Sequence, residues 1–182
     1  MVESHHHVSL SHHIKKIREQ AKKSMERGPV TADYHLNLEK AYQYLNAALA
    51  TEIMCVLRYR HHQIVAKGID RPQVAAEFKE HADEEEAHMM LIANRINQLG
   101  GDPDFNPDSV TRRTATEYGT GDSLFKMIEE DLVAERVAIM TYRELIDWFG
   151  SKDPTTRGIF EFILKEEEEH ADEMAQLLKY KK

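Results

Sequence analysis

The sequence predicts an all-α protein, an up-down-down-up four-helix bundle with one long crossover and an extra N-terminal helix. Three observations lead to this fold class. Gly and Pro are scarce, at 8 and 5 of 182 residues, and strand-like alternation is hard to find. Apolar residues recur at steps of three and four over four long segments. The links between these segments are short, long and short, as in a bundle with one crossover.

The composition is that of a globular protein rich in surface helix, with 41% hydrophobic and 31% charged residues. The net charge of -8 argues against attraction of the bundle to nucleic acid or anionic membranes, and it suits a protein that attracts cations. Apolar runs are too short for a membrane span, and a secretory signal core is missing. A single cysteine, Cys55, rules out an intrachain disulfide. We therefore expect a cytoplasmic protein with no membrane partner.

Residues 1–34 are predicted to form a separate part, before a bundle over residues 35–182. It comprises a loose tail and a short basic helix over residues 11–27, ended by Gly28-Pro29. The histidines in and beside the tail, which could hold a metal weakly, are His5, His6, His7, His12 and His13. A narrow apolar stripe on the helix consists of Ile14, Ile17, Ala21 and Met25. We expect this stripe to pack on the bundle or on a neighbouring chain.

The first two long helices are predicted over residues 33–67 and 71–99. Gly68 ends the first helix and Gly100-Gly101 ends the second. A short link therefore joins them, which makes the two helices antiparallel neighbours.

Residues 102–121 are rich in Gly and Pro and are interpreted as a long connection. The third long helix is predicted to begin after a cap at Asp122 or Ser123 and to end near Gly150. The fourth follows a cap at Asp153 and continues to about residue 179. Another short link makes this second pair antiparallel as well.

Each long helix carries one glutamate within its apolar stripe. These residues are Glu52, Glu85, Glu135 and Glu167. An unpaired carboxylate in a core costs several kcal/mol, roughly, so four together require cations. Glu85-x-x-His88 and Glu167-x-x-His170 add two imidazoles, because residues three apart on a helix point the same way. Four carboxylates and two histidines around one point form a di-metal carboxylate pattern, which suits iron or manganese and also zinc.

The spacing of the four glutamates in the sequence predicts that they lie at the same height along the bundle axis. The first pair of glutamates, Glu52 and Glu85, lies 33 residues apart, and the second pair, Glu135 and Glu167, lies 32 apart. Both Glu-x-x-His pairs sit in acidic runs, residues 84–86 and 166–169. Glu85 and Glu167 are chosen from these runs because each precedes a histidine by three residues and lies on the apolar face.

Four stretches around these residues carry a family resemblance: Ala50-Thr51-Glu52, Glu85-Glu86-Ala87-His88, Leu132-Val133-Ala134-Glu135 and Glu166-Glu167-Glu168-Glu169-His170. Over roughly residues 35–180 the chain resembles the ferritin superfamily, and bacterioferritins in particular. The resemblance implies two iron ions per chain. Glu52 and His88 would be terminal ligands of one ion, Glu135 and His170 of the other, with Glu85 and Glu167 as bridges.

Tyr59 lies two turns after Glu52 and matches the tyrosine beside the site in bacterioferritins. It is either a redox residue or a core aromatic. Bacterioferritins bind haem through a methionine two residues before the second-helix histidine. Glu86 stands at that position here, so no haem is expected.

Other features resemble Dps and Dps-like proteins, which form twelve-subunit shells. These are the basic N-terminal helix, the long middle link, the turn at residues 149–154 and an end at the fourth helix. The ligands fall within one chain, as in the Dps-like group. That group often has a cysteine pair near the site, but Val137 stands where one is expected, so thiol chemistry is not predicted.

The likeness implies a ferroxidase that oxidises Fe(II) with dioxygen or peroxide and stores ferric mineral in a homo-oligomeric shell, with 12 subunits favoured over 24. One alternative is a rubrerythrin-like peroxidase or another di-metal peroxidase or oxygenase, although one cysteine cannot build a four-cysteine iron site. A second alternative is a stress-protection protein of Dps type that binds DNA through the basic helix.

Overall fold

The computed structural model of the chain describes residues 10–179, and these residues form only helices, turns and loops. The elements are α1 (Leu10–Gln20), the 3-10 turn η1 (Met25–Arg27), α2 (Leu38–Val65), α3 (Arg71–Gln98), α4 (Pro107–Arg113), α5 (Leu124–Phe149) and α6 (Pro154–Lys179). Among them, none is both long and apolar enough to cross a membrane.

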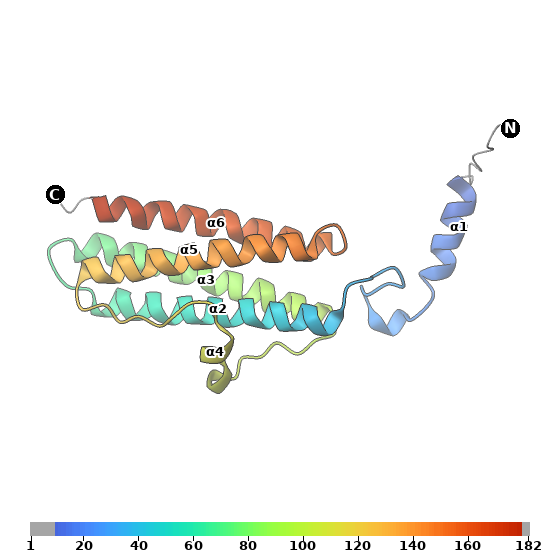
Figure 1. Cartoon of the computed structure of the whole chain (residues 1–182), viewed down its shortest axis with the longest axis horizontal. Helices are drawn as coiled ribbons and strands as arrows, with labels where there is room; N and C mark the ends of the chain where they lie inside the picture. Colours follow the sequence, from blue (N-terminus) through green and yellow to red (C-terminus); the bar gives the residue numbers. More distant parts are fainter. Residues whose placement is uncertain (1–9, 180–182) are drawn as a thin grey trace.

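The four long helices form two antiparallel pairs, α2 with α3 and α5 with α6 (Figure 1). Helix α2 also contacts α5, and α3 contacts α6, so the two pairs close into one bundle. The segment after α3 returns along the bundle before α5 begins, so α3 and α5 run in the same direction. The predicted up-down-down-up topology with one crossover is therefore confirmed.

Side-chain caps set where the long helices begin. The Asn37 side chain accepts a hydrogen bond from the Lys40 backbone N–H at 3.0 Å, so α2 begins at residue 38 and not at the predicted 33. Ser123, the second of the two predicted caps, accepts from the Lys126 N–H at 3.2 Å. Gly150 ends α5 with a φ of 48°, a conformation that favours glycine.

The single N-terminal helix predicted over residues 11–27 is wrong in extent. Helix α1 ends at Gln20, and Ser24 adopts a left-handed φ of 51° before η1. The predicted packing on this chain's own bundle is also wrong: α1 stands apart (Figure 1), and Ile14 and Ile17 are exposed. Helix α1 has only 11 residues and does not pack on the bundle, so it lacks the tertiary contacts that normally stabilise a longer helix. Packing on a neighbouring chain and the division at residue 34 stay predictions, and His5, His6 and His7 lie outside the described residues.

The long connection contains a helix that the sequence analysis missed. Pro107 is the first residue of α4, where its missing N–H costs nothing, and Asn106 caps it by accepting from the Asp108 N–H at 3.0 Å. Arg113 donates to the backbone oxygens of Asn46 and Asp104, at 2.5 and 2.8 Å. These bonds hold α4 against α2.

Two apolar clusters fill the bundle on either side of its middle. One contains Leu45, Leu49, Ile92, Phe149 and Phe160 among others. The other contains Tyr59, Phe78, Ile128 and Met174 among others. Burial of this apolar surface is the main favourable contribution to folding, and it leaves a polar layer between the clusters.

A buried polar network ties α3 to the start of α6. Asp153 caps α6 by accepting from the Thr156 N–H at 2.9 Å, as predicted, and Arg95 donates to both of its carboxylate oxygens at 2.9 and 3.1 Å. The hydroxyl of Tyr34 donates to the same carboxylate at 2.8 Å. Burial opposes ionisation of Asp153, but the hydrogen bonds from Thr156 outweigh it and lower the pKa of Asp153.

We expect Asp153→Ala to reduce the free energy of unfolding by about 3–5 kcal/mol, because it leaves Arg95 buried without its partner and removes a cap. Since the pKa of Asp153 is lowered, its contribution is present above about pH 4 and is lost on acidification. Urea denaturation of parent and variant at pH 7 and pH 3 measures both effects. Equal losses at the two pH values would contradict this role.

Candidate metal centre

Four glutamates converge in the polar layer between the apolar clusters. Glu52 comes from α2, Glu85 from α3, Glu135 from α5 and Glu167 from α6, and all four are buried. Their neighbours in the acidic runs lie further out, with Glu86 and Glu168 about half exposed. The helical periodicity that fills the core therefore also turns these four carboxylates inward.

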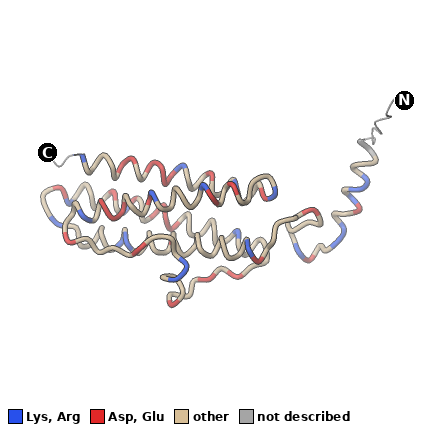
Figure 2. The backbone as a smooth tube through the Cα atoms, in the orientation of Figure 1, with Lys and Arg blue, Asp and Glu red and all other residues tan. Residues whose placement is uncertain are grey.

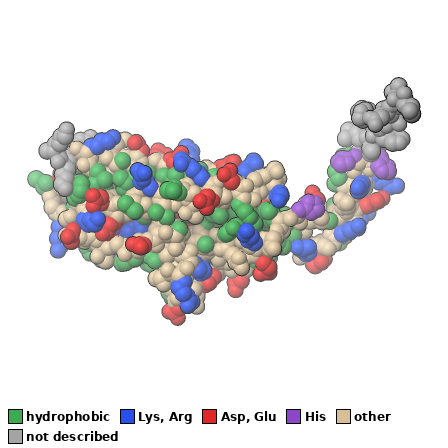
Figure 3. Space-filling model, in the orientation of Figure 1, with side chains coloured by type: hydrophobic (Ala, Val, Ile, Leu, Met, Phe, Trp, Pro, Cys, Tyr) green, Lys and Arg blue, Asp and Glu red, His purple; other side chains and the backbone are tan. Residues whose placement is uncertain are grey.

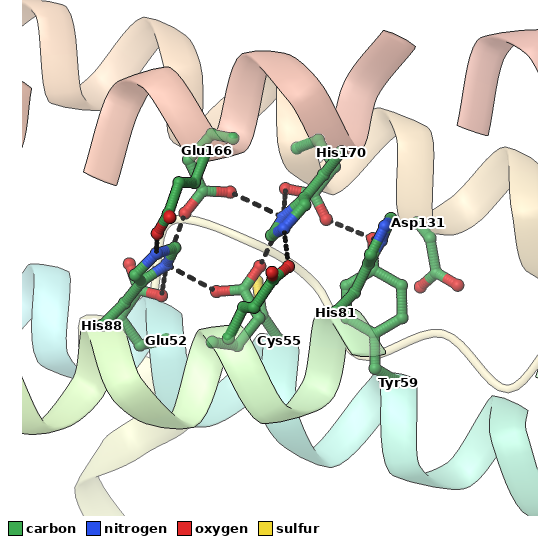
Figure 4. A network of polar contacts seen from close by, with 12 residues as sticks. Glu52, Cys55, Tyr59, His81, His88, Asp131, Glu166 and His170 are labelled. Carbon is green, nitrogen blue, oxygen red and sulfur yellow. Dashed lines mark hydrogen bonds and ion pairs between the residues drawn. The ribbon is translucent and has the colours of Figure 1, made fainter. Parts of the chain in front are cut away.

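Two histidines close the ring of carboxylates (Figure 4). The Nδ1 atom of His88 lies 3.3 Å from Glu167 and 3.7 Å from both Glu52 and Glu85. The Nδ1 atom of His170 lies 3.6 Å from Glu85, 3.9 Å from Glu167 and 4.0 Å from Glu135. The structure thus brings together all six residues that the sequence analysis selected as metal ligands.

The outer nitrogen of each histidine is held by a carboxylate from the opposite helix. The Nε2 atom of His88 lies 2.6 Å from Glu166 Oε2, and the Nε2 atom of His170 lies 2.7 Å from Glu84 Oε2. Such partners fix the orientation of metal-binding imidazoles in proteins. The sequence places Glu84 and Glu166 in the acidic runs around the ligands but does not pair them with these histidines, because the contacts cross between helices and only the tertiary fold decides them.

Two tyrosines bind the carboxylates of α2 and α5 in a reciprocal arrangement. Tyr59 donates to Glu135, and Tyr142 donates to Glu52. Each tyrosine follows the glutamate of its own helix by seven residues and bonds the glutamate of the other helix. Tyr142 was missed as a site residue, although that repeated spacing of seven was a signal for it.

Most unpaired polar atoms in the buried part of the described chain point into this centre. Of ten buried side-chain nitrogen and oxygen atoms without a hydrogen-bond partner, eight belong to the six residues. They include both Nδ1 atoms and both oxygens of Glu85 and of Glu167. Buried polar atoms are normally paired, so a convergent set of free lone pairs fits cations. Oxygen donors with two nitrogens suit iron, manganese or zinc.

The pKa values of the residues in the centre indicate which groups hold protons that metal ions would displace. Burial raises the pKa of Glu52 and of Glu167 well above its ordinary value. Burial by itself lowers the pKa of His170, but contacts with Glu85 and Glu135 outweigh it and raise this pKa to about 9. The pKa of His88 is raised too, by its carboxylate neighbours against the effect of burial. Without metal, protons therefore offset the buried negative charge.

A further buried network lies beside the centre, between α2 and α5. Asp131 accepts from Arg58 Nε at 2.7 Å, and its other oxygen lies 2.8 Å from His62 Nδ1. Arg58 also donates to the backbone oxygen of Glu117 at 3.0 Å, which ties the crossover to the bundle. Sequence analysis did not select these residues, because a single charge within a stripe usually lies at its edge.

We expect divalent metal binding to release protons at pH 7 and to strengthen as the pH rises toward 9, because Nδ1 of His170 must lose its proton to bind. Calorimetry with Zn²⁺ in buffers of different ionisation enthalpy measures the release. The control is Glu85→Ala with Glu167→Ala, which keeps the N-terminal histidines and lacks the centre. Proton release of equal size in both proteins would contradict the expectation.

Comparisons with known proteins indicate the family of this chain. A family model for the ferritin-like domain matches residues 42–182. The bacterioferritin of Rhodobacter capsulatus is 29% identical over 134 residues, which cover 73% of this chain and 79% of that protein. A nutrient stress-induced DNA-binding protein of Nostoc sp. is 31% identical over 138 residues, 74% of each chain.

Solved structures show the same fold. A dodecameric thioferritin, the bacterioferritin-related protein from Bacteroides fragilis, is 34% identical with a TM-score of 0.76, over 79% of this chain and 87% of that one. Dps from Thermosynechococcus elongatus shares the fold at 18% identity and a TM-score of 0.74, over 77% of this chain and 90% of that one. With its six inward-facing side chains and a family match over most of its length, this chain belongs to the ferritin-like family.

Proposed function

We propose that this protein oxidises Fe(II) at a di-iron site within one chain and stores the product as ferric mineral. The observation that carries the proposal is the set of eight unpaired buried atoms on the two Glu-x-x-His pairs and the two other glutamates. The family adds support, because it contains bacterioferritins. Iron is the substrate in this proposal, and the six side chains are its binding groups.

The ligand atoms divide into two overlapping sets. Glu52 and His88 belong to one set, and Glu135 and His170 to the other. Glu85 and Glu167 belong to both, and the ligand atoms within each set lie within 4.8 Å of one another. This overlap supports two metal positions that share Glu85 and Glu167 as bridges.

The electron balance is simple. Two Fe(II) ions give up one electron each, and dioxygen takes both electrons with two protons to become hydrogen peroxide. With peroxide as the oxidant, the same two electrons and two protons give two water molecules. Four carboxylates favour the more positive Fe(III) pair, because their charge offsets it in a site that excludes water. Glu84 and Glu166 hold the imidazoles with Nδ1 inward, and Tyr59 and Tyr142 hold two of the carboxylates.

A shell of twelve chains is the assembly we propose, because the similar Bacteroides fragilis protein is described as dodecameric. Figure 3 shows hydrophobic side chains spread over one face of the bundle. Exposed apolar residues include Leu57, Ile64, Val133 and Met140, which are more than half exposed and would be covered by neighbouring chains. The cytoplasmic location stays a prediction from the sequence.

DNA binding is a second candidate function, and the position of α1 favours it. Lys and Arg side chains line this helix (Figure 2), which stands away from the acidic bundle. The similar Nostoc protein is described as DNA-binding. Phosphate contacts by such a basic segment would depend strongly on salt.

We expect Glu85→Ala with Glu167→Ala to slow Fe(II) oxidation by at least about tenfold, since even outer partners of metal ligands are worth about 10- to 100-fold. Absorbance of ferric product after adding Fe(II) and oxidant to metal-free protein measures the rate. Glu86→Ala with Glu168→Ala is the matched control, because it removes two exposed glutamates from the same acidic runs. If the first variant oxidises iron as fast as the parent, the proposed site is wrong.

The mass of the native assembly tests the storage role. We expect twelve chains by light scattering, with soluble ferric mineral retained in the same peak on gel filtration. A dimer that retains no mineral would contradict storage and favour the di-metal peroxidase or oxygenase alternative.

Removal of residues 1–28 tests the DNA role. We expect the full chain to retard DNA at low salt and the truncated chain to lose this retention, with iron oxidation unchanged. No retardation by the full chain at low salt would exclude the second candidate.

A further inference from the structure

The apolar side chains of α1 are not covered by this chain's own bundle. Ile14 and Ile17 lie one turn apart on the helix, and both are exposed. The segment after α1 is fixed to the bundle, because Val30 is buried and the Tyr34 hydroxyl donates to Asp153 at 2.8 Å. From this anchor α1 projects beyond the end of the bundle (Figure 1). The apolar stripe of α1 is therefore available to a second molecule.

A groove with an apolar floor lies between the crossover and α5. Its volume is about 740 Å³, and its lining includes Val133 and Val137 from α5 and Tyr118 from the crossover. Val133 and Tyr118 are exposed in the single chain. The backbone N–H of Gly121 donates to Glu130 at 3.0 Å, which holds the crossover beside α5 and fixes one wall of the groove. An apolar groove of this kind is what an amphipathic helix binds.

The charges of α1 and of the groove are opposite in sign. Three basic residues and one acidic residue lie on α1: Lys15, Lys16, Arg18 and Glu19. The groove has the reverse composition, with three glutamates and one lysine: Glu117, Glu129, Glu130 and Lys126. Arg18 follows Ile14 by four residues, so it lies beside the apolar stripe and faces the rim when the stripe faces the floor. Such charge complementarity selects a partner and fixes its register.

We propose that α1 of one chain packs into the groove between the crossover and α5 of a second copy. Ile14 and Ile17 then cover Val133 and Val137, and the basic side chains of α1 face the glutamates of the groove. A helix of 11 residues buries less surface than a stable interface needs, so this contact adds to an assembly that other surfaces hold together. The inference requires only that two copies meet, and it does not depend on the oxidation of iron.

The apolar stripe separates this contact from the binding of DNA by the same helix. Phosphate contacts use the basic side chains and do not require the isoleucines. A helix that binds only DNA leaves Ile14 and Ile17 in water in the assembled protein, whereas a docked helix buries them. The two roles therefore differ in whether a neighbouring chain covers the stripe.

A disulfide between two different chains tests the contact directly. A tagged chain with Ile17→Cys is co-expressed with an untagged chain that carries Val133→Cys, and the control carries Ile69→Cys, a more exposed apolar position outside the groove. We expect the tagged–untagged pair to form at least about tenfold faster with Val133→Cys, because docking raises the effective concentration of the two thiols. The native Cys55 is buried and present in every combination, so its background cancels. Equal rates for the two untagged chains would overturn the inference and leave the proposed iron site standing.

Cleavage of α1 by trypsin, which cuts after lysine and arginine, measures whether the stripe is covered in the native assembly. We expect Ile14→Asp with Ile17→Asp to be cut in α1 at least about tenfold faster than the parent, because burial of two isoleucines favours the docked helix by more than that factor. Val133→Asp should raise the rate in the same way, although it leaves α1 unchanged, and Ile69→Asp should not. If Val133→Asp is cut no faster than the parent, the groove is not the partner of α1. That result is also the one expected of a helix used only for DNA.

Discussion

The burial of four carboxylates within a few ångströms of one another is the constraint on which the rest of this structure depends. Each of Glu52, Glu85, Glu135 and Glu167 is withdrawn from water, where an isolated ionised group would cost many kcal/mol, on the order of tens in a dry interior. Protons or metal ions must compensate for that charge. The two apolar clusters on either side keep water out, so the same packing that stabilises the bundle strengthens every electrostatic interaction between them.

The surrounding polar residues hold the side chains of this charged layer in position. Glu84 and Glu166 hold the histidine rings, while Tyr59 and Tyr142 donate to two of the carboxylates. These groups leave the inward-facing lone pairs free. A centre built in this way is costly to the folded protein without cations, and binding of metal contributes directly to its stability.

The N-terminal helix, unlike the four long helices, is not stabilised by burial in the bundle. Its stripe is narrow, and Ile14 and Ile17 remain exposed in the single chain. Nothing in the described part of the bundle covers them, so the helix extends over only 11 residues. Lys and Arg predominate on this helix, whereas the bundle carries both signs of charge (Figure 2).

By itself, the sequence determined the four helices, their order and the inward face of each, because periodicity and caps act within a few residues. It also selected the six side chains that converge, because the glutamates of the two hairpins lie 33 and 32 residues apart and so reach the same height along the bundle. Only the tertiary structure decided that Glu84 meets His170, that Glu166 meets His88, and that His81 reaches Glu173. It also decided that Pro107 begins a helix and that Ser24 interrupts one. The side-chain pairings depend on contacts between residues far apart in the chain, which no local pattern encodes, and the interruption at Ser24 reflects the lack of such contacts. The start of α4 has a local signal, the Asn106 cap before Pro107, within a segment that was interpreted as a connection.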